Sequence, residues 1–328
     1  MTEKTKGKQT IRRINTIFAS GDKSTMELAP IVLFVYNRPK HTRKVLMSLE
    51  KNMLASDSLI YIISDGPKNA DAVEPVNAVR SIIREPWHFK HITIIERSQN
   101  LGLAENVIDG VTKVINKHGR VIVLEDDLET SPWALTYFND ALERYQHHER
   151  VMEISGFMYP VQHPRRLPKS FFFRVANSWG WATWKSAWDK FNPDIQELTK
   201  DFKRRDRRRF SIDGKENFWK QVKEYRAGKI NSWAIRWYLS VFKNNGLVLY
   251  PRHSMVQNLG TDGSGTHSDL DDAYRVELAQ SRVKYFPEEI EENQKAYNAI
   301  KHFYATRKGP LLERIVRYAI KKWGKKPQ

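Results

Sequence analysis

The sequence predicts an α/β protein with a mostly parallel, doubly wound central sheet. Four apolar runs rich in β-branched residues lie between residues 31 and 124, and a segment with helical hydrophobic spacing separates each from the next. Strands that alternate with helices in this way belong to parallel sheets, because each helix carries the chain back across the sheet. Polar residues follow every run directly. The carboxyl ends of parallel strands meet at one edge, where open α/β sheets bind their ligands.

The predicted elements follow one another closely. The four strands are Ile31 to Tyr36, Leu59 to Ile63, His91 to Ile95 and Val121 to Leu124. Helices are predicted around Val45 to Leu49, from Val73 to Arg84 and from Ala104 to Lys117. The polar residues at the strand ends are Asn37 and Arg38, then Asp65, then Arg97 and Asn100, and finally Glu125, Asp126 and Asp127. We therefore expect these side chains to line one crevice of the kind that binds a nucleotide.

The fourth strand runs straight into the three carboxylates of Glu125, Asp126 and Asp127. Adjacent carboxylates repel one another unless a cation or a donor-rich ligand offsets their charge. One interpretation is a divalent-metal site, and the alternative is a strand-end turn with solvated acids. A helix is predicted to follow at once, from about Pro132 to His147, with Thr130 or Ser131 as its cap.

The second half of the chain also contains predicted strands and helices. Strands are predicted at Val151 to Ser155, Phe171 to Val175 and Leu247 to Pro251, and helices at Glu216 to Arg226 and Trp233 to Phe242. The tryptophan-rich segment 177–188 by itself favours core packing, with a sugar or acceptor pocket as the alternative. The glycine-rich loop from Asn258 to His267 is either a surface loop or a lid that closes on a ligand.

The chain is strongly basic, with 55 lysines and arginines against 38 acids and a net charge of +17. Such a protein binds polyanions, and an anionic membrane surface is a candidate partner. Common nucleic-acid-binding motifs are lacking, so a nucleic-acid partner is not expected. The run from Lys200 to Arg209 is either a solvated helix or an anionic partner surface. Residues 312–323 have the pattern of a basic amphipathic helix, which either docks on the domain or lies on a membrane.

Composition limits the chemistry and the compartment. There are no cysteines, which excludes disulfides, thiolate zinc sites and a cysteine nucleophile. No long apolar run predicts a transmembrane helix, and Met1 to Lys8 is too polar for a signal peptide. We expect a cytoplasmic protein, with its basic tail as a candidate attachment to the inner face of the cytoplasmic membrane.

Several of these motifs, taken in order, resemble those of the GT-A glycosyltransferases. They are Asn37-Arg38-Pro39, Ser64-Asp65, the acidic segment Glu125 to Glu129, and Gly180-Trp181 with the following Trp188. The resemblance extends from about Pro30 to His267. The chain is similar to the N-acetylglucosaminyltransferase I type and to related bacterial enzymes of polysaccharide and lipopolysaccharide assembly.

The resemblance implies a metal-dependent transfer of a hexosyl or N-acetylhexosaminyl group from a UDP-sugar to a glycan or lipid-linked glycan. It makes Asp127 the ligand of Mn²⁺ or Mg²⁺, with Glu125 and Asp126 supporting the donor. The other implied donor-binding residues are Asn37, Arg38, Asp65 (at the uracil), Arg97 and Asn100, and those of the acceptor or lid are Trp181, Asn258 and His267. A hard divalent cation beside carboxylates and a substrate diphosphate is also what ligand chemistry expects.

The same family pattern expects a general base and inversion at the anomeric carbon. The expected carboxylate falls near Asn231-Ser232-Trp233, where Asn231 cannot act as a base. Asp262 is the predicted catalytic residue in its place, with Asp189 and Glu216 as the next candidates.

We divide the chain into a basic N-terminal extension (1–28), a nucleotide-sugar-binding half (29–150), an acceptor-side half (151–285) of the same domain, and a basic helical tail (286–328). Two other functions stay open. A sugar-phosphate nucleotidyltransferase would release pyrophosphate, and a basic nucleic-acid- or membrane-binding protein would have no catalytic activity.

Overall fold

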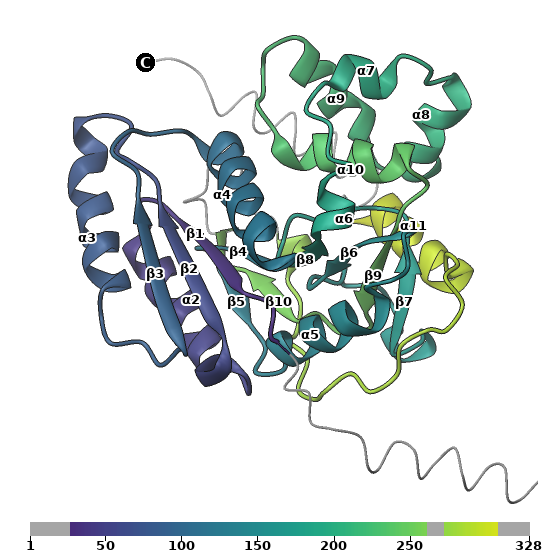
Figure 1. The fold of residues 1–328 in the computed structure, drawn as a ribbon. Coiled ribbons are helices and arrows are strands. Elements are labelled where there is room, and N and C mark those ends of the chain that lie inside the picture. Colours follow the sequence, from purple (N-terminus) through teal and green to yellow (C-terminus); the bar gives the residue numbers. More distant parts are fainter. Residues whose placement is uncertain (1–26, 261–271, 308–328) are drawn as a thin grey trace, which may run out of the picture.

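The computed structural model describes residues 27–260 and 272–307, which form an α/β domain around one large sheet (Figure 1). Within these residues, eight strands are hydrogen-bonded in the order β3-β2-β1-β4-β8-β6-β9-β7. The strands are β1 (Ile31–Val35), β2 (Leu59–Ser64), β3 (His91–Glu96), β4 (Arg120–Glu125), β6 (Val151–Ser155), β7 (Ser170–Phe173), β8 (Trp181–Trp184) and β9 (Leu247–Pro251). A separate ribbon pairs β5 (Leu128–Thr130) with β10 (Val256–Asn258) in antiparallel fashion.

Strand direction decides which loops meet. Strands β1 to β4 are mutually parallel, as predicted from their alternation with helices. Strand β8 runs antiparallel to both β4 and β6, so β6 again points the same way as β4, and β9 is parallel to β6. The carboxyl ends of β1, β2, β3, β4, β6 and β9 therefore share one edge of the sheet, which we call the carboxyl edge.

Helices cover both faces of this sheet (Figure 1). They are α2 (Pro39–Glu50), α3 (Val73–Ile83), α4 (Leu103–His118), α5 (Ala134–Tyr145), α6 (Lys185–Trp188), α7 (Ile195–Thr199), α8 (Arg204–Phe210), α9 (Phe218–Arg226), α10 (Trp233–Lys243) and α11 (Gln294–Thr306). Helices α4, α6 and α10 pack on one face, and α2, α3 and α5 pack on the other. Gly110 lets α4 approach closely, since a Cβ there would lie 2.5 Å from the Ile63 side chain.

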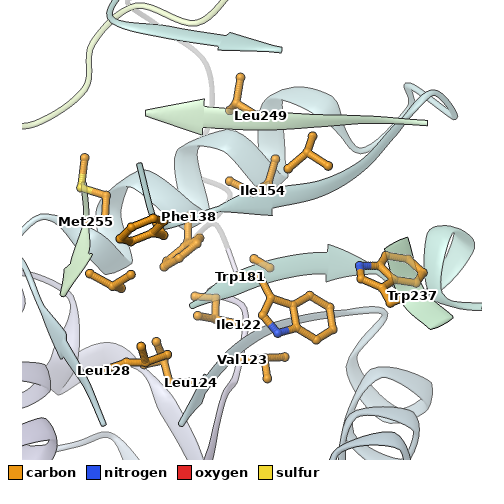
Figure 2. Packing of buried hydrophobic residues seen from close by; sticks show 14 of the residues in the cluster. Ile122, Val123, Leu124, Leu128, Phe138, Ile154, Trp181, Trp237, Leu249 and Met255 are labelled. Atoms are coloured by element: carbon orange, nitrogen blue, oxygen red, sulfur yellow. The ribbon is translucent and has the colours of Figure 1, made fainter. Parts of the chain in front are cut away.

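The core under the carboxyl edge is apolar and fully enclosed (Figure 2). Ile122, Val123 and Leu124 of β4 are at most 1% exposed, which explains why this strand is apolar between its two terminal residues. Trp181 of β8 is also fully buried, and its ring stacks 5.3 Å from that of Trp233. The tryptophan-rich segment thus packs in the core, as its composition by itself favours.

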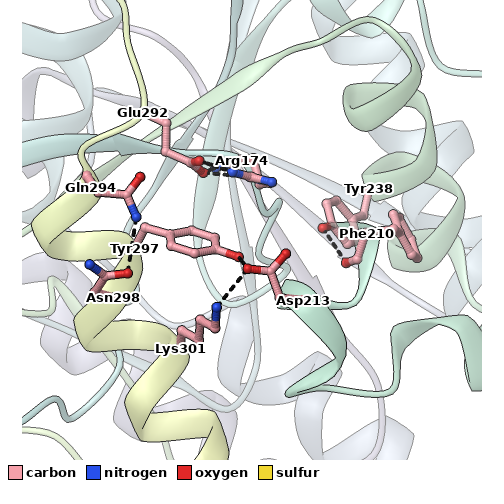
Figure 3. Close-up of polar contacts among 9 residues, drawn as sticks. All are labelled: Arg174, Phe210, Asp213, Tyr238, Glu292, Gln294, Tyr297, Asn298 and Lys301. Atoms are coloured by element: carbon pink, nitrogen blue, oxygen red, sulfur yellow. Dashed lines mark hydrogen bonds and ion pairs between the residues drawn. The ribbon is translucent and has the colours of Figure 1, made fainter. Parts of the chain in front are cut away.

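A polar cluster fastens α11 to the middle of the chain (Figure 3). Asp213 accepts hydrogen bonds from the Tyr297 hydroxyl (2.6 Å) and from Lys301 Nζ (2.7 Å). Arg174, just after β7, forms an ion pair with Glu292 at the start of the same region. These contacts join residues far apart in sequence, so the position of α11 depends on tertiary contacts and not on the sequence beside it.

The structure corrects the prediction for the segment after the acids. Strand β5 comes first, and α5 begins at Ala134, so the helix does not follow the acids at once. Neither Thr130 nor Ser131 caps it, because Trp133 is the cap residue. The amide of Leu135 in its first turn instead donates to Asn52 Oδ1 (3.0 Å) from the end of α2. A side chain distant in sequence thus supplies the hydrogen bond expected from a local cap.

Three segments named above lie outside the described residues: positions 1–26 of the N-terminal extension, positions 261–271 of the glycine-rich loop, and positions 308–328 of the tail. Among the helices of the described residues, none is long and apolar enough to span a membrane.

Candidate active site at the carboxyl edge

Three carboxylates and one guanidinium form the centre of the candidate site. Glu125 is the last residue of β4, and Asp126 and Asp127 follow it before β5. Arg38, at the carboxyl end of β1, forms an ion pair with Asp126 and places Nη2 3.1 Å from Asp127 Oδ2. The backbone amide of Tyr36 also donates to Asp126 (3.2 Å). Strands β1 and β4 are neighbours, which is why residues so far apart in sequence meet here.

The three acids carry more negative charge than Arg38 can balance. Burial by itself would lower the pKa of Arg38, but Asp126 and Asp127 raise it above its usual value. Burial, together with the charges of Asp127 and Asp126, raises the pKa of Glu125 to about 8 despite the opposing charge of Arg38. Burial likewise raises the pKa of Asp126 despite its contact with Arg38. No described residue donates a hydrogen bond to the Glu125 carboxylate, so the site lacks one positive partner.

In the absence of divalent cations, Glu125 is expected to make the free energy of unfolding depend on pH. Between an ordinary pKa of 4.5 and the folded value of about 8, the folded state binds one proton more than the unfolded state. The free energy of unfolding therefore falls as pH rises through this window. Glu125→Gln is expected to gain stability over the wild type between pH 5 and pH 8.5, by at least about 1.4 kcal/mol, the equivalent of one pKa unit. Chemical denaturation of both proteins at the two pH values measures the difference, and an equal response would contradict it.

The β5–β10 ribbon brings a second segment against the acids. The amide of Leu259 donates to the Asp127 carbonyl (2.7 Å), and the amide of Gly260 donates to Asn258 Oδ1 (2.7 Å). A Cβ at Gly260 would lie 2.5 Å from Asp127 Oδ2 and 3.3 Å from Arg38 Nη1. Only glycine lets the backbone come this close to the carboxylate.

Gly260→Ala is therefore expected to displace the Asp127 carboxylate or the backbone that faces it. Because small misplacements at a reacting site are costly, we expect transfer activity to fall about a hundredfold. The free energy of unfolding should fall by about 1–3 kcal/mol, the usual cost of adding a methyl group at a tightly packed buried position. Gly102→Ala is not a matched control because its φ is +75°, so Gly246→Ala, where a Cβ meets the flexible Met152 side chain, serves instead. Equal activity in the two variants would contradict the expectation.

Asp65 has a different local role from the other acids. Its carboxylate accepts hydrogen bonds from the amides of Gly66 (2.9 Å), Leu101 (2.9 Å) and Gly102 (3.0 Å), and from the side chain of Asn100 (3.1 Å). The side chain is only 4% exposed, so it holds the loop after β3 against the loop after β2. Asp65 and Asn100 are thus brought together, as a shared crevice predicts, and their contact with a donor nucleotide stays a prediction.

Arg97 follows β3, and Asn37 follows β1. The Arg97 guanidinium points to α4, where it donates to Asn106 Oδ1 (3.1 Å) and pairs with Asp109. These two contacts hold the Arg97 guanidinium on α4, so Arg97 would have to break them in order to bind a donor. Asn37 is half-buried at the end of β1, next to Arg38, and forms no hydrogen bond with the described residues through its side chain.

Of the residues predicted for the acceptor or lid, the structure excludes Trp181. Its side chain is 0% exposed and surrounded by the rings of Trp188, Trp233 and Trp237, so it cannot contact an acceptor. Asn258 is in β10, opposite Leu128, and it orients Gly260. His267 lies outside the described residues.

The candidate bases are placed very differently. Asp262 lies outside the described residues. Asp189 follows α6, which starts at the opposite edge, because Trp184 pairs with Arg120 at the beginning of β4. Its carboxylate pairs with Lys185 (2.6 Å), so we exclude it as the base. Glu216 pairs with Arg307, whose guanidinium lies over the ring of Tyr274. Asn231 accepts a hydrogen bond from Arg236 (3.1 Å), which also lies 3.9 Å from Glu105 at the start of α4.

Sequence reasoning missed Tyr36 and Gly260. The amide of Tyr36 holds Asp126, and its hydroxyl accepts a hydrogen bond from the amide of Lys68 (3.1 Å), so Tyr36 links the ends of β1 and β2. The signal available for Tyr36 was its place at the end of the first apolar run. Gly260 could be found only as one glycine among several in a loop.

The donor set fits a hard divalent cation that is shared with a substrate. In the part of the chain that the structure describes, no three acidic or histidine side chains are arranged to hold a metal ion by themselves. Arg38 contacts two acids, and the side chain of Asp127 is the more exposed of them, at 14% against 5% for that of Asp126. One accessible carboxylate in an excess of negative charge suits Mn²⁺ or Mg²⁺ whose remaining ligands come from a diphosphate.

Comparison with known proteins agrees with this geometry. Residues 31–190 match glycosyl transferase family 2. The matched segment starts at β1, ends just after α6 and contains Arg38, Asp65 and all three acids. The match supports glycosyltransferase activity and agrees with the GT-A architecture of the sheet.

A structural similarity covers a smaller part of the chain. TarS of S. aureus is 14% identical over 38% of this chain and 21% of its own, with a TM-score of 0.27. The chain thus spans about a fifth of the length of TarS. No curated protein matches the chain.

Proposed function

We propose that the protein is a metal-dependent glycosyltransferase that uses a UDP-sugar. It would move a hexosyl or N-acetylhexosaminyl group to a hydroxyl of a glycan or lipid-linked glycan, with inversion, in the manner of the N-acetylglucosaminyltransferase I type. The observation that carries the proposal is the acidic cluster at the carboxyl edge, inside the segment that matches glycosyl transferase family 2. The net charge of +17 supports a location of the enzyme at the anionic cytoplasmic face of a membrane.

Electrostatics explain why such an enzyme would need a metal. Glu125, Asp126 and Asp127 are balanced by Arg38 alone, so they would repel the diphosphate of a donor. A divalent cation held by Asp127 would reverse this repulsion and stabilise the departing UDP. Arg38 fixes the position of Asp127, and the lack of a side chain at Gly260 leaves space beside the Asp127 carboxylate.

Other residues would shape the donor pocket and activate the acceptor. Asp65 holds the loops after β2 and β3 together, which would fix the wall that faces the nucleotide. Asp262 is our proposed general base on the sequence argument, with Glu216 as the alternative. Either carboxylate would have to accept the proton of the attacking hydroxyl.

A thermal-shift screen with UDP-N-acetylglucosamine, UDP-glucose and UDP, each with and without Mn²⁺, tests the function. A ligand at a hundred times its Kd stabilises the fold by about 2.7 kcal/mol, so binding is readily measured. We expect stabilisation by a UDP-sugar that requires the metal. Stabilisation by a nucleoside triphosphate, with release of pyrophosphate from a sugar phosphate, would point to a nucleotidyltransferase instead.

A further inference from the structure

A groove lined by cations lies at the carboxyl edge, on the side of the sheet beyond β8. Its volume is about 610 Å³, and it is formed by residues 158–166 after β6, residues 252–254 after β9, and residues 275–277. The charged and imidazole side chains in it are His163, Arg165, Arg166, Arg252, His253, Arg275 and Glu277. Four arginines therefore face a single glutamate, and we call this feature the basic groove.

Within the described residues, Glu277 is the one acid that lines the basic groove beside its four arginines. Among the described residues, no acid forms an ion pair with Arg165, Arg166 or Arg275, and Arg252 Nε donates to the Pro168 carbonyl (3.1 Å). Partial burial lowers the pKa of His253, and Arg252, Lys169 and Arg165 lower it further, with Glu277 opposing them. The groove thus has a positive potential, and converging arginines of this kind bind phosphate or carboxylate in bidentate fashion.

The topology places the basic groove within reach of the acidic cluster. In the strand order β4-β8-β6-β9, the end of β6 is two strands from the end of β4, and the end of β9 is three. Neighbouring strands lie about 4.8 Å apart, so these ends are about 10 and 14 Å from that of β4. All three strands point to the carboxyl edge. The loops that line the basic groove follow the ends of β6 and β9, so the groove and the acidic cluster share the carboxyl edge.

We propose that the basic groove binds an anionic group of the acceptor, a phosphate or a carboxylate on a sugar near the hydroxyl that is glycosylated. The inference rests on the proposed function and names the class of acceptor: an anionic glycan. A neutral glycan would leave the arginines without a partner, whereas an anionic one offsets their mutual repulsion. The acidic cluster and the basic groove would then set the direction of the acceptor along the edge.

Met158 lines the groove and offers a local probe, because its methyl group can be observed by NMR in the full chain labelled at methionine. Met158→Leu assigns its resonance among the seven methionines. The probes are glucose 6-phosphate and glucuronic acid, which separate phosphate from carboxylate binding, and glucose is the neutral control. We expect one or both anionic sugars to move the Met158 resonance saturably, and glucose to leave it in place.

Arg165→Gln with Arg166→Gln is expected to weaken that binding about tenfold or more, since each arginine supplies charge-assisted hydrogen bonds. The matched control is Arg204→Gln with Arg205→Gln on α8, which removes the same charge from exposed positions elsewhere. It should leave the binding unchanged. An equal loss in the control, or an equal response to glucose, would overturn the proposal.

The thermal-shift screen separates this inference from the proposed function. The Arg165 and Arg166 variant should keep the Mn²⁺-dependent stabilisation by a UDP-sugar. A wild-type chain that binds a UDP-sugar but shows no response at Met158 would overturn the anionic acceptor alone. A chain that responds at Met158 but binds no UDP-sugar would overturn the proposed function, and with it the acceptor role of the groove.

Discussion

Asp127→Ala is expected to abolish Mn²⁺-dependent stabilisation by a UDP-sugar and to lower kcat/KM by about a hundred- to a thousandfold. The side chain is the accessible member of the pair that Arg38 contacts, so its loss would remove the proposed protein ligand of the metal. Thermal shift measures the first effect, and release of UDP in the presence of acceptor measures the second.

The fold should survive this change, because Arg38 retains Asp126 as a partner. Glu129→Ala is the matched control, since it removes a nearby carboxylate that lies in β5 and not among the residues that Arg38 contacts. Equal metal-dependent binding in the Asp127 variant and the wild type would refute Asp127 as the ligand.

Arg38→Met is expected to have the largest effect on stability, a loss of about 3–5 kcal/mol in the free energy of unfolding. Removing one partner of a buried ion pair leaves an uncompensated charge in the interior. Here the arginine side chain is 19% exposed and that of Asp126 only 5%, and Asp127 would lose its partner as well. Chemical denaturation in the absence of divalent cations measures the change.

Arg43→Met provides the comparison, because its pair with Glu85 has side chains exposed by 46% and 38%, and solvent screening leaves such a pair little effect on stability. Adding Asp126→Asn to Arg38→Met should recover part of the loss, since the more buried of the two uncompensated carboxylates is then neutral. The electrostatic account fails if the two arginine variants are equally stable.

Local patterns in the sequence predicted the first half of the fold well. Strands β1, β2 and β4 are largely buried and the edge strand β3 is partly buried, so all four appear as apolar runs. Their observed bounds differ from the predicted ones by about one residue. The direction of β8 could not be predicted, because no residue in Trp181–Trp184 indicates whether a strand runs with or against its neighbour. The ribbon of β5 and β10 was missed for a related reason: each strand has three residues, and they pair across a long stretch of chain.

In the candidate site, as in the fold, residues placed by local pattern were predicted and residues placed by distant contacts were missed. Arg38, Asp65 and the three acids stand at strand ends, where the rule for parallel sheets places ligand-binding residues. Gly260 contacts Asp127 only because β10 pairs with β5, so its role depends on a contact that local pattern does not contain. Trp181 was wrongly assigned to the acceptor, since an aromatic residue beside glycine has the same composition in a core as in a sugar pocket.

The antiparallel strand β8 joins the two halves of the domain into one continuous hydrogen-bonded sheet. Loops on the far side of β8 can therefore be exchanged between homologous enzymes without changing the frame that holds Arg38 and Asp127. Residues 157–161 after β6 are mostly buried, whereas residues 162–166 are mostly exposed. A chimera that replaces residues 162–166 should therefore keep the donor and accept a new partner molecule. Acceptor choice would then be a modular property, inherited through short exposed loops rather than through the whole domain.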